Sequence, residues 1–370
     1  MADLQARYEI MAGEGLKSAA ERSLEIAGSS AVGRYLMELY ASNGMGRTTD
    51  PSLHTEVSGV PLENPVIVGA GWDKKGRAIH GLYALGFAAA EIGTVLPFGQ
   101  YGNEKPRLWT INQDHSVGLN RLGFNSPGDA VVDTYLQAAQ PLPCPIGLNV
   151  GRNKTMPNET AAWAHERVIR RLGHYASYIV LGISSPNTVG LRGLQDKGPL
   201  RELIQSALAA MTEAKPLFIK IDSERSKHEL NDMIEVGLEE GLSGFVATNT
   251  YMGSDLKAKY GIRWAREAGG LSGADPEYRK RATATVRHIH EEAGDKLTII
   301  GVGGVDSAET ALEKIKAGAS AVQVVTAIRS TKGRVAEQIN RELVKQIDAD
   351  GMRSIRDYIG LDTKRGVKAA

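Results

Sequence analysis

The amino-acid sequence predicts an α/β protein, a (β/α)8 (TIM) barrel preceded by a short N-terminal helical segment. Eight apolar, strand-like runs recur between residues 65 and 328, and most are followed by apolar residues at helical spacing. These runs are Pro65–Gly71, Ala88–Val95, Pro145–Gly151, Tyr178–Ser184, Leu217–Asp222, Gly244–Thr250, Leu297–Gly304 and Ala321–Ile328. Eight successive units predict a closed barrel with its active site at the carboxyl ends of the strands. An open, doubly wound sheet is the competing architecture.

The first 55 residues have a different pattern, so we expect a boundary between residues 1–55, a helical hairpin and linker, and residues 56–370, the barrel. Apolar residues at helical spacing flank a turn at Gly28–Ser30. They are Leu16, Ala20, Leu24 and Ala27 before the turn, and Val32, Leu36, Leu39 and Tyr40 after it. We interpret the hairpin as a cap on the barrel. The alternatives are a peripheral membrane contact through residues 1–45 and the mouth of a tunnel for an apolar substrate.

Composition restricts the class of protein. A hydrophobic content of 42% and a charged content of 24% are ordinary for a soluble globular chain, and a net charge of +1 gives no reason to expect nucleic acid as a partner. The single cysteine, Cys144, excludes an intrachain disulfide and a cysteine cluster, and we expect no metal. The sequence lacks a secretory signal and an apolar run of about 18 residues. These features predict a cytoplasmic protein, or one held peripherally on the cytoplasmic face of the inner membrane.

The fourth strand-like run leads into the segment that we expect to carry the chemistry. The segment Ser184–Thr188 places hydroxyl and amide side chains directly after an apolar strand, where the barrel would open. Pro186 favours an extended backbone at Ser185. An ordinary polar turn is the alternative. Two long connections, residues 96–144 and 251–296, are expected to form lids or substrate-binding insertions at this end of the barrel.

Two further features predict an anionic ligand in the barrel mouth. The Gly303–Gly304 turn follows the seventh strand and Thr326 lies on the eighth, which is where barrels of this type bind phosphate. Lys220 lies inside the fifth strand, where an isolated buried charge would be costly. It therefore either faces a ligand or pairs with Asp222 or a glutamate. Lys74, after the first strand, either faces a substrate carboxylate or is solvated.

Six segments resemble, in their order, motifs of the dihydroorotate dehydrogenase family. They are Gly71–Lys74, Asn103–Arg107, Asn120–Asn125, Ser184–Arg192, Gly269–Gly273 and Ile300–Gly304. The resemblance extends from about residue 55 to about residue 360. Serine at residue 185, where class 1 members have cysteine, and the helical segment before the barrel make the chain similar to the class 2, quinone-linked branch.

The resemblance implies oxidation of dihydroorotate to orotate in pyrimidine biosynthesis, with FMN as cofactor. Ser185 would accept the C5 proton while the C6 hydride goes to FMN N5. Thr188 and an ordered water would relay the proton, and Phe124 would form an apolar wall around them. Lys220 would lie near the N1/O2 edge of the flavin. The implied FMN contacts are Ala70, Gly71, Thr94, Asn149, Lys220, Thr248, Gly273, Gly303, Gly304 and Thr326. The implied substrate contacts are Lys74, Asn120, Arg121, Leu122, Gly123, Phe124, Asn187, Asn249 and Thr250. A quinone would reoxidise the flavin.

Five positions differ from the family pattern. Gly182 replaces an asparagine expected to touch both substrate and flavin, and Asp222-Ser223 replaces an Ala-Pro pair after Lys220. Val325 and Ala20 stand where the branch has tyrosine and histidine near the quinone. These differences leave two alternatives open. The first is an FMN oxidoreductase acting on another dihydropyrimidine or using another electron acceptor, and the second is an inactive, flavin-binding homologue.

Overall fold

The computed structural model describes residues 23–25, 33, 46–185 and 190–363. Most of the predicted N-terminal hairpin lies outside these residues. The short stretch Ser23–Glu25 lies against the barrel: Leu24 packs on the core, and the Glu25 carboxylate pairs with Arg77 at 2.8 Å and with Lys75 at 3.5 Å. Within the described residues, no helix is both long and apolar enough to span a bilayer.

The described chain contains a closed barrel of parallel strands, so the open-sheet alternative is excluded. The strands, in order around the barrel, are β3 (Val66–Val68), β4 (Ala89–Val95), β7 (Ile146–Val150), β8 (Tyr178–Leu181), β9 (Leu217–Ile221), β10 (Gly244–Ala247), β12 (Thr298–Val302) and β13 (Ala321–Val324). All the predicted strands are confirmed. The eighth is shorter than predicted, because helix α13 (Thr326–Ser330) begins where the run was expected to continue.

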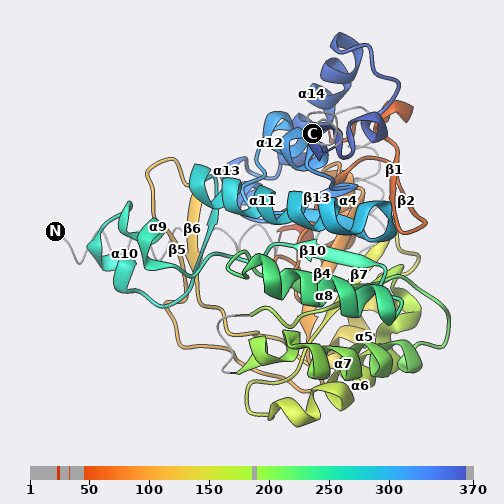
Figure 1. Ribbon diagram of the computed structural model, residues 1–370, viewed down its shortest axis with the longest axis vertical. Coiled ribbons are helices and arrows are strands. Elements are labelled where there is room, and N and C mark those ends of the chain that lie inside the picture. Colours follow the sequence, from red (N-terminus) through yellow and green to blue (C-terminus); the bar gives the residue numbers. More distant parts are fainter. Residues whose placement is uncertain (1–22, 26–32, 34–45, 186–189, 364–370) are drawn as a thin grey trace.

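A helix follows each barrel strand and packs on its outer face (Figure 1). These helices are α4 (Ile79–Ala84), α5 (Asp129–Ala138), α6 (Ala161–Leu172), α7 (Lys197–Ala210), α8 (Lys227–Glu239), α11 (Pro276–Ala293), α12 (Ala308–Lys316) and α14 (Val335–Ala349). In α14, Val335, Ile339, Leu343 and Ile347 are buried, because this i, i+4 stripe faces the barrel. The apolar core therefore lies between the strands and this ring of helices.

A β-hairpin closes the amino-terminal end of the barrel. The sequence did not predict this hairpin, which lies where the barrel domain was expected to begin. Its strands are β1 (Thr55–Val57) and β2 (Val60–Leu62), and its apolar side chains join the core inside the barrel. Thr55 Oγ1 donates to the carbonyl of Ser320, and Ser58 Oγ to that of Ser243. Both acceptors precede barrel strands, so the opposite end of the barrel is the open one.

The two long connections meet at that open end and form a three-stranded antiparallel sheet, the lid sheet. It consists of β5 (Leu108–Thr110) and β6 (Val117–Asn120) from one connection and β11 (Gly270–Gly273) from the other. With the short helices α9 (Ser254–Ala258) and α10 (Ile262–Arg266), this sheet extends from one side of the barrel (Figure 1). It has its own apolar cluster, centred on Trp109 and Trp264, whose rings meet edge to face.

His165 on α6 should make folding sensitive to acid. The imidazole is fully buried, and desolvation lowers its pKa from 6.5 to about 4. Below pH 6.5 the unfolded chain therefore takes up a proton that the folded chain refuses, so a stabilisation of about 3 kcal/mol present above pH 6.5 is lost as the pH falls through 4. Urea unfolding of His165→Gln should show a flatter pH dependence between 6.5 and 4. His228→Gln, at a side chain that is 87% exposed, is the control and should follow the parent chain.

Candidate active site

The carboxyl ends of the barrel strands and the lid sheet enclose a cavity of about 660 Å³, a size typical of small-molecule sites. Most of the predicted site residues line it. They are Ala70, Gly71, Lys74, Thr94, Asn120, Leu122, Gly123, Phe124, Asn149, Ser185, Lys220, Thr248, Asn249, Thr250, Gly273, Gly303, Gly304 and Thr326. Asn187 and Thr188 lie outside the described residues, and their roles stay predictions.

A ring of buried polar side chains, the floor ring, surrounds the Lys220 ammonium. Lys220 Nζ lies 3.6 Å from Glu91 Oε1 and donates to Gln323 Oε1 at 3.3 Å. The Glu91 carboxylate also accepts hydrogen bonds from Asn149 Nδ2, at 2.8 Å, and from Gln323 Nε2. Thr94 Oγ1 donates to Asn149 Oδ1 at 2.7 Å. The ion-pair partner of Lys220 is thus a glutamate and not Asp222. Since Glu91 is completely buried, the two charges depend on each other.

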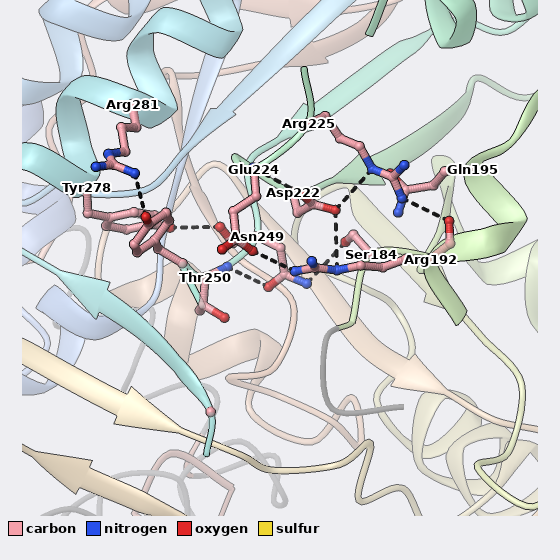
Figure 2. A network of polar contacts seen from close by, with 12 residues as sticks. Ser184, Arg192, Gln195, Asp222, Glu224, Arg225, Asn249, Thr250, Tyr278 and Arg281 are labelled. Carbon is pink, nitrogen blue, oxygen red and sulfur yellow. Dashed lines mark hydrogen bonds and ion pairs between the residues drawn. The ribbon is translucent and has the colours of Figure 1, made fainter. Parts of the chain in front are cut away.

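The ends of β8 and β10 bring Ser184 and Asn249 together (Figure 2). Asn249 Nδ2 donates to Ser184 Oγ at 3.1 Å, and the Thr250 N–H donates to Asn249 Oδ1 at 2.8 Å. The hydroxyl of Tyr278 donates to the Asn249 carbonyl at 3.1 Å. Asn249 is therefore held on three sides, while the buried Ser185 lines the cavity beside it.

Asp222 lies outside the cavity, in an ion-pair cluster behind the Ser185 segment (Figure 2). Its buried carboxylate lies 3.5 Å from Arg192 Nε and 3.6 Å from Arg225 Nε, and Arg192 also pairs with Glu224 at 2.8 Å. Arg192 belongs to the short 3-10 helix that begins at Leu191, just beyond the predicted catalytic segment. Through its ion pair with Arg192, Asp222 thus links the segment after Ser185 to the end of β9.

The lid sheet contributes Asn120, at the end of β6, and the turn that follows it. Gly123 and Phe124 in this turn have φ values of 67° and 53°, a left-handed conformation that is strained for phenylalanine. Gln100 Nε2 donates to both of their carbonyl oxygens at 3.1 Å, which holds Phe124 against the cavity. Arg121 is not part of the cavity lining: its guanidinium donates to the Pro106 carbonyl at 3.1 Å and lies 3.7 Å from Glu267.

Four side chains of this region were not predicted as site residues from the sequence. They are Glu91 and Gln323 of the floor ring, and Ser272 and Arg329 at the lid side of the cavity. The signal for the first two was present, because each is a polar residue in the middle of an apolar strand. No local signal could have singled out Ser272 or Arg329. They reach the cavity because β11 pairs with β6 in the lid sheet and α13 packs against β11.

Comparisons with known proteins agree with this geometry. Residues 52–347 match the family model described as dihydroorotate dehydrogenase. The chain is 39% identical over 328 residues to the dihydroorotate dehydrogenase (quinone) of Anaeromyxobacter sp. strain Fw109-5, covering 86% of this chain and 88% of that protein. The chain belongs to the dihydroorotate dehydrogenase family.

More distant members have the same architecture. The mitochondrial dihydroorotate dehydrogenase (quinone) of Mus musculus is 38% identical over 325 residues, covering 85% of this chain and 80% of that protein. A crystal structure of DHODH from Eimeria tenella in complex with ferulenol superposes with a TM-score of 0.79 at 31% identity, covering 89% of this chain and 94% of that one. The resemblance to the quinone-linked branch is thereby confirmed, and the dihydroorotate dehydrogenases are generally flavin-dependent oxidoreductases.

The space beside Gly182, where the resemblance to the family predicted an asparagine, is filled by neighbouring groups. A Cβ at this position would lie 2.5 Å from Asn149 Oδ1, 2.9 Å from the Val150 carbonyl and 3.3 Å from Thr94 Cγ2. The Asn149 amide, held by Glu91 and Thr94, therefore occupies the volume that a side chain at residue 182 would need. Restoring the family residue here would displace part of the floor ring.

Gly182→Ala should consequently weaken both folding and flavin retention. Asn149 would have to move, and overpacking of this kind costs about 1–3 kcal/mol of unfolding free energy. Urea unfolding and the flavin-to-protein absorbance ratio of the purified variant measure the two effects. Gly198→Ala is the matched control, because a Cβ there meets no atom within 4 Å and should leave both quantities unchanged. Unaltered stability and flavin content in Gly182→Ala would show that Asn149 is free to shift.

Proposed function

We propose that this chain oxidises dihydroorotate to orotate, with FMN as its flavin and a quinone as electron acceptor. One observation carries the proposal. Among the described residues that line the cavity, four are lysine or arginine and none is aspartate or glutamate. They are Lys74, Lys220, Arg329 and Lys332. Such a site favours ligands with anionic groups in more than one place, which matches the phosphate of FMN and the carboxylate of dihydroorotate.

The residues present suit FMN. The Gly303–Gly304 turn, with φ values of 105° and 76°, and Gly273 offer backbone that a ligand can approach closely, and Thr326 adds a hydroxyl. These groups would hold the phosphate. Thr94, Asn149 and Lys220 of the floor ring would hold the polar edge of the ring system. When bound, FMN supplies a two-electron acceptor, and the Lys220 charge stabilises anionic character at that edge.

The substrate would lie between the floor ring and the lid sheet. Asn120 and Asn249, together with Asn187, offer the paired donors and acceptors that a pyrimidine edge needs. Lys74, whose Nζ donates to the Gly71 carbonyl at 2.5 Å, is held at the end of β3 and can bind the carboxylate. Ser185 would take the C5 proton, passing it outward through Thr188, and Phe124 would keep bulk water away from the reacting carbons.

The electron acceptor would bind beside apolar residues of the cavity lining. These include Leu24, Leu85, Val325 and Ile328. A quinone ring suits these side chains, and the relatives named dihydroorotate dehydrogenase (quinone) support the choice. We further propose that residues 1–55 form a cap beside these residues, with residues 1–45 making a peripheral membrane contact on the cytoplasmic face of the inner membrane. The barrel, residues 56–370, would carry the chemistry.

The test is anaerobic reduction of the purified protein. Dihydroorotate should bleach the flavin absorbance, and a soluble quinone should restore it faster than fumarate or oxygen does. Bleaching by other dihydropyrimidines but not by dihydroorotate would overturn the substrate assignment. Gly182 is the reason to test these other substrates. Faster reoxidation by fumarate or oxygen would overturn only the acceptor.

A further inference from the structure

Arg329 is a cation at the cavity wall with no partner in the described part of the chain. It lies in α13, and its Nε atom is covered from solvent without a hydrogen bond. No hydrogen bond or ion pair of its guanidinium is found among the described residues. Burial lowers the pKa of the guanidinium from its ordinary value. A desolvated, unpaired charge costs free energy, so its retention points to a partner that binds from outside.

The surroundings of Arg329 show which part of the cavity it faces. Arg329 and Ser272 pack closely around Gly118 of the lid sheet: a Cβ there would lie 3.3 Å from Arg329 Nη2 and also 3.3 Å from Ser272 Oγ. Thr326 Oγ1 donates to the same Ser272 hydroxyl at 3.0 Å. Thr326 is one helical turn before Arg329, and side chains in helices lean toward the preceding turn. The guanidinium, the two hydroxyls and Gly273 therefore converge at the junction of β6, β11 and α13.

The chemistry of this junction fits a phosphate better than a neutral group. A guanidinium forms paired, charge-assisted hydrogen bonds with phosphate oxygens, and hydroxyl groups complete such a site. No acidic side chain among the described lining residues could compensate the charge instead. Lys332, further along the chain, is exposed, so its charge does not depend on an anion from the ligand as the buried charge of Arg329 does.

We propose that Arg329 binds the phosphate of the flavin and so makes this chain select FMN over riboflavin. This inference deepens the proposed function and rests on it. The backbone of the glycine turns would fix the position of the phosphate, and Arg329 would supply the side-chain charge that neutralises it.

The experiment compares FMN and riboflavin, which differ in the phosphate alone, in titrations of the full-length chain freed of flavin. Arg329→Gln should raise the Kd for FMN by about 10- to 100-fold, the loss expected for a hydrogen-bonded charge, and leave the Kd for riboflavin unchanged. Arg329→Lys should recover part of the FMN affinity, and this recovery should weaken at high salt. Arg334→Gln, at an exposed arginine outside the cavity lining, is the control for the loss of a nearby surface charge and should bind both flavins as the parent chain does.

Each other outcome is decisive. Equal losses for FMN and riboflavin in Arg329→Gln would mean a structural role and would overturn the inference. Unchanged FMN affinity with an altered KM for the quinone would assign Arg329 to the acceptor. A parent chain that binds neither flavin would overturn the proposed function itself, which keeps the two failures distinct.

Discussion

Ser185→Ala should slow anaerobic flavin reduction by dihydroorotate by about 10²- to 10⁴-fold, the contribution expected of a general base. Ser185 is buried and lines the cavity, which places its hydroxyl where the substrate would bind. Alanine removes the proton acceptor while leaving the floor ring intact. Stopped-flow absorbance with saturating dihydroorotate measures the rate, and the flavin content of the variant should equal that of the parent.

A rate change at Ser185 is meaningful only if other hydroxyls near the cavity behave differently. Ser330 lines the cavity, and its hydroxyl donates to the Ala327 carbonyl at 3.3 Å. Ser330→Ala should therefore reduce its flavin at the parent rate. Flavin reduction in Ser185→Ala at the rate of the parent would remove this hydroxyl from the mechanism, whatever its position.

Lys220→Met should destabilise the protein by about 3–5 kcal/mol and abolish stable flavin binding. The lysine is the counter-charge of Glu91, which is completely buried, and its removal leaves that carboxylate with amide donors alone. The flavin would also lose the cation at its polar edge. Urea unfolding reports the first effect, and the absorbance of the purified variant reports the second.

The double variant Lys220→Met, Glu91→Gln separates the two consequences. Neutralising Glu91 removes the orphaned charge, so folding stability should recover by several kcal/mol while flavin affinity stays low. A single Lys220→Met variant as stable as the parent would contradict the ion-pair account. Full recovery of flavin binding in the double variant would show that the cation is not needed at the ring edge.

Local sequence patterns predicted most of the architecture and many of the residues that line the site. Runs such as Tyr178–Leu181 are apolar on both faces because a barrel strand is covered inside and out, so they could be recognised without knowing their neighbours. Functional groups in such a fold come from strand ends, which is why Lys220, Asn249 and the Gly303–Gly304 turn could be singled out by position alone.

What the local sequence could not indicate depends on contacts between distant segments. The lid sheet pairs β6 with β11, which are about 150 residues apart, and neither segment shows a strong strand pattern by itself. The partner of Lys220 was left open between Asp222 and a glutamate. In the structure the partner is Glu91 on β4, three strands from β9 around the barrel, because side chains that point inward from different strands meet in the interior.

By itself, the amino-acid sequence determined that this chain forms a barrel of strand–helix units with polar groups at one end. This is possible because apolar periodicity and strand-end chemistry are local properties. Only the tertiary structure decided which charges meet: Glu91 with Lys220, Asp222 with two arginines, and Arg329 with no partner among the residues that the structure describes. The physical reason is that the free energy of a charge depends on what surrounds it in space, which sequence order does not state.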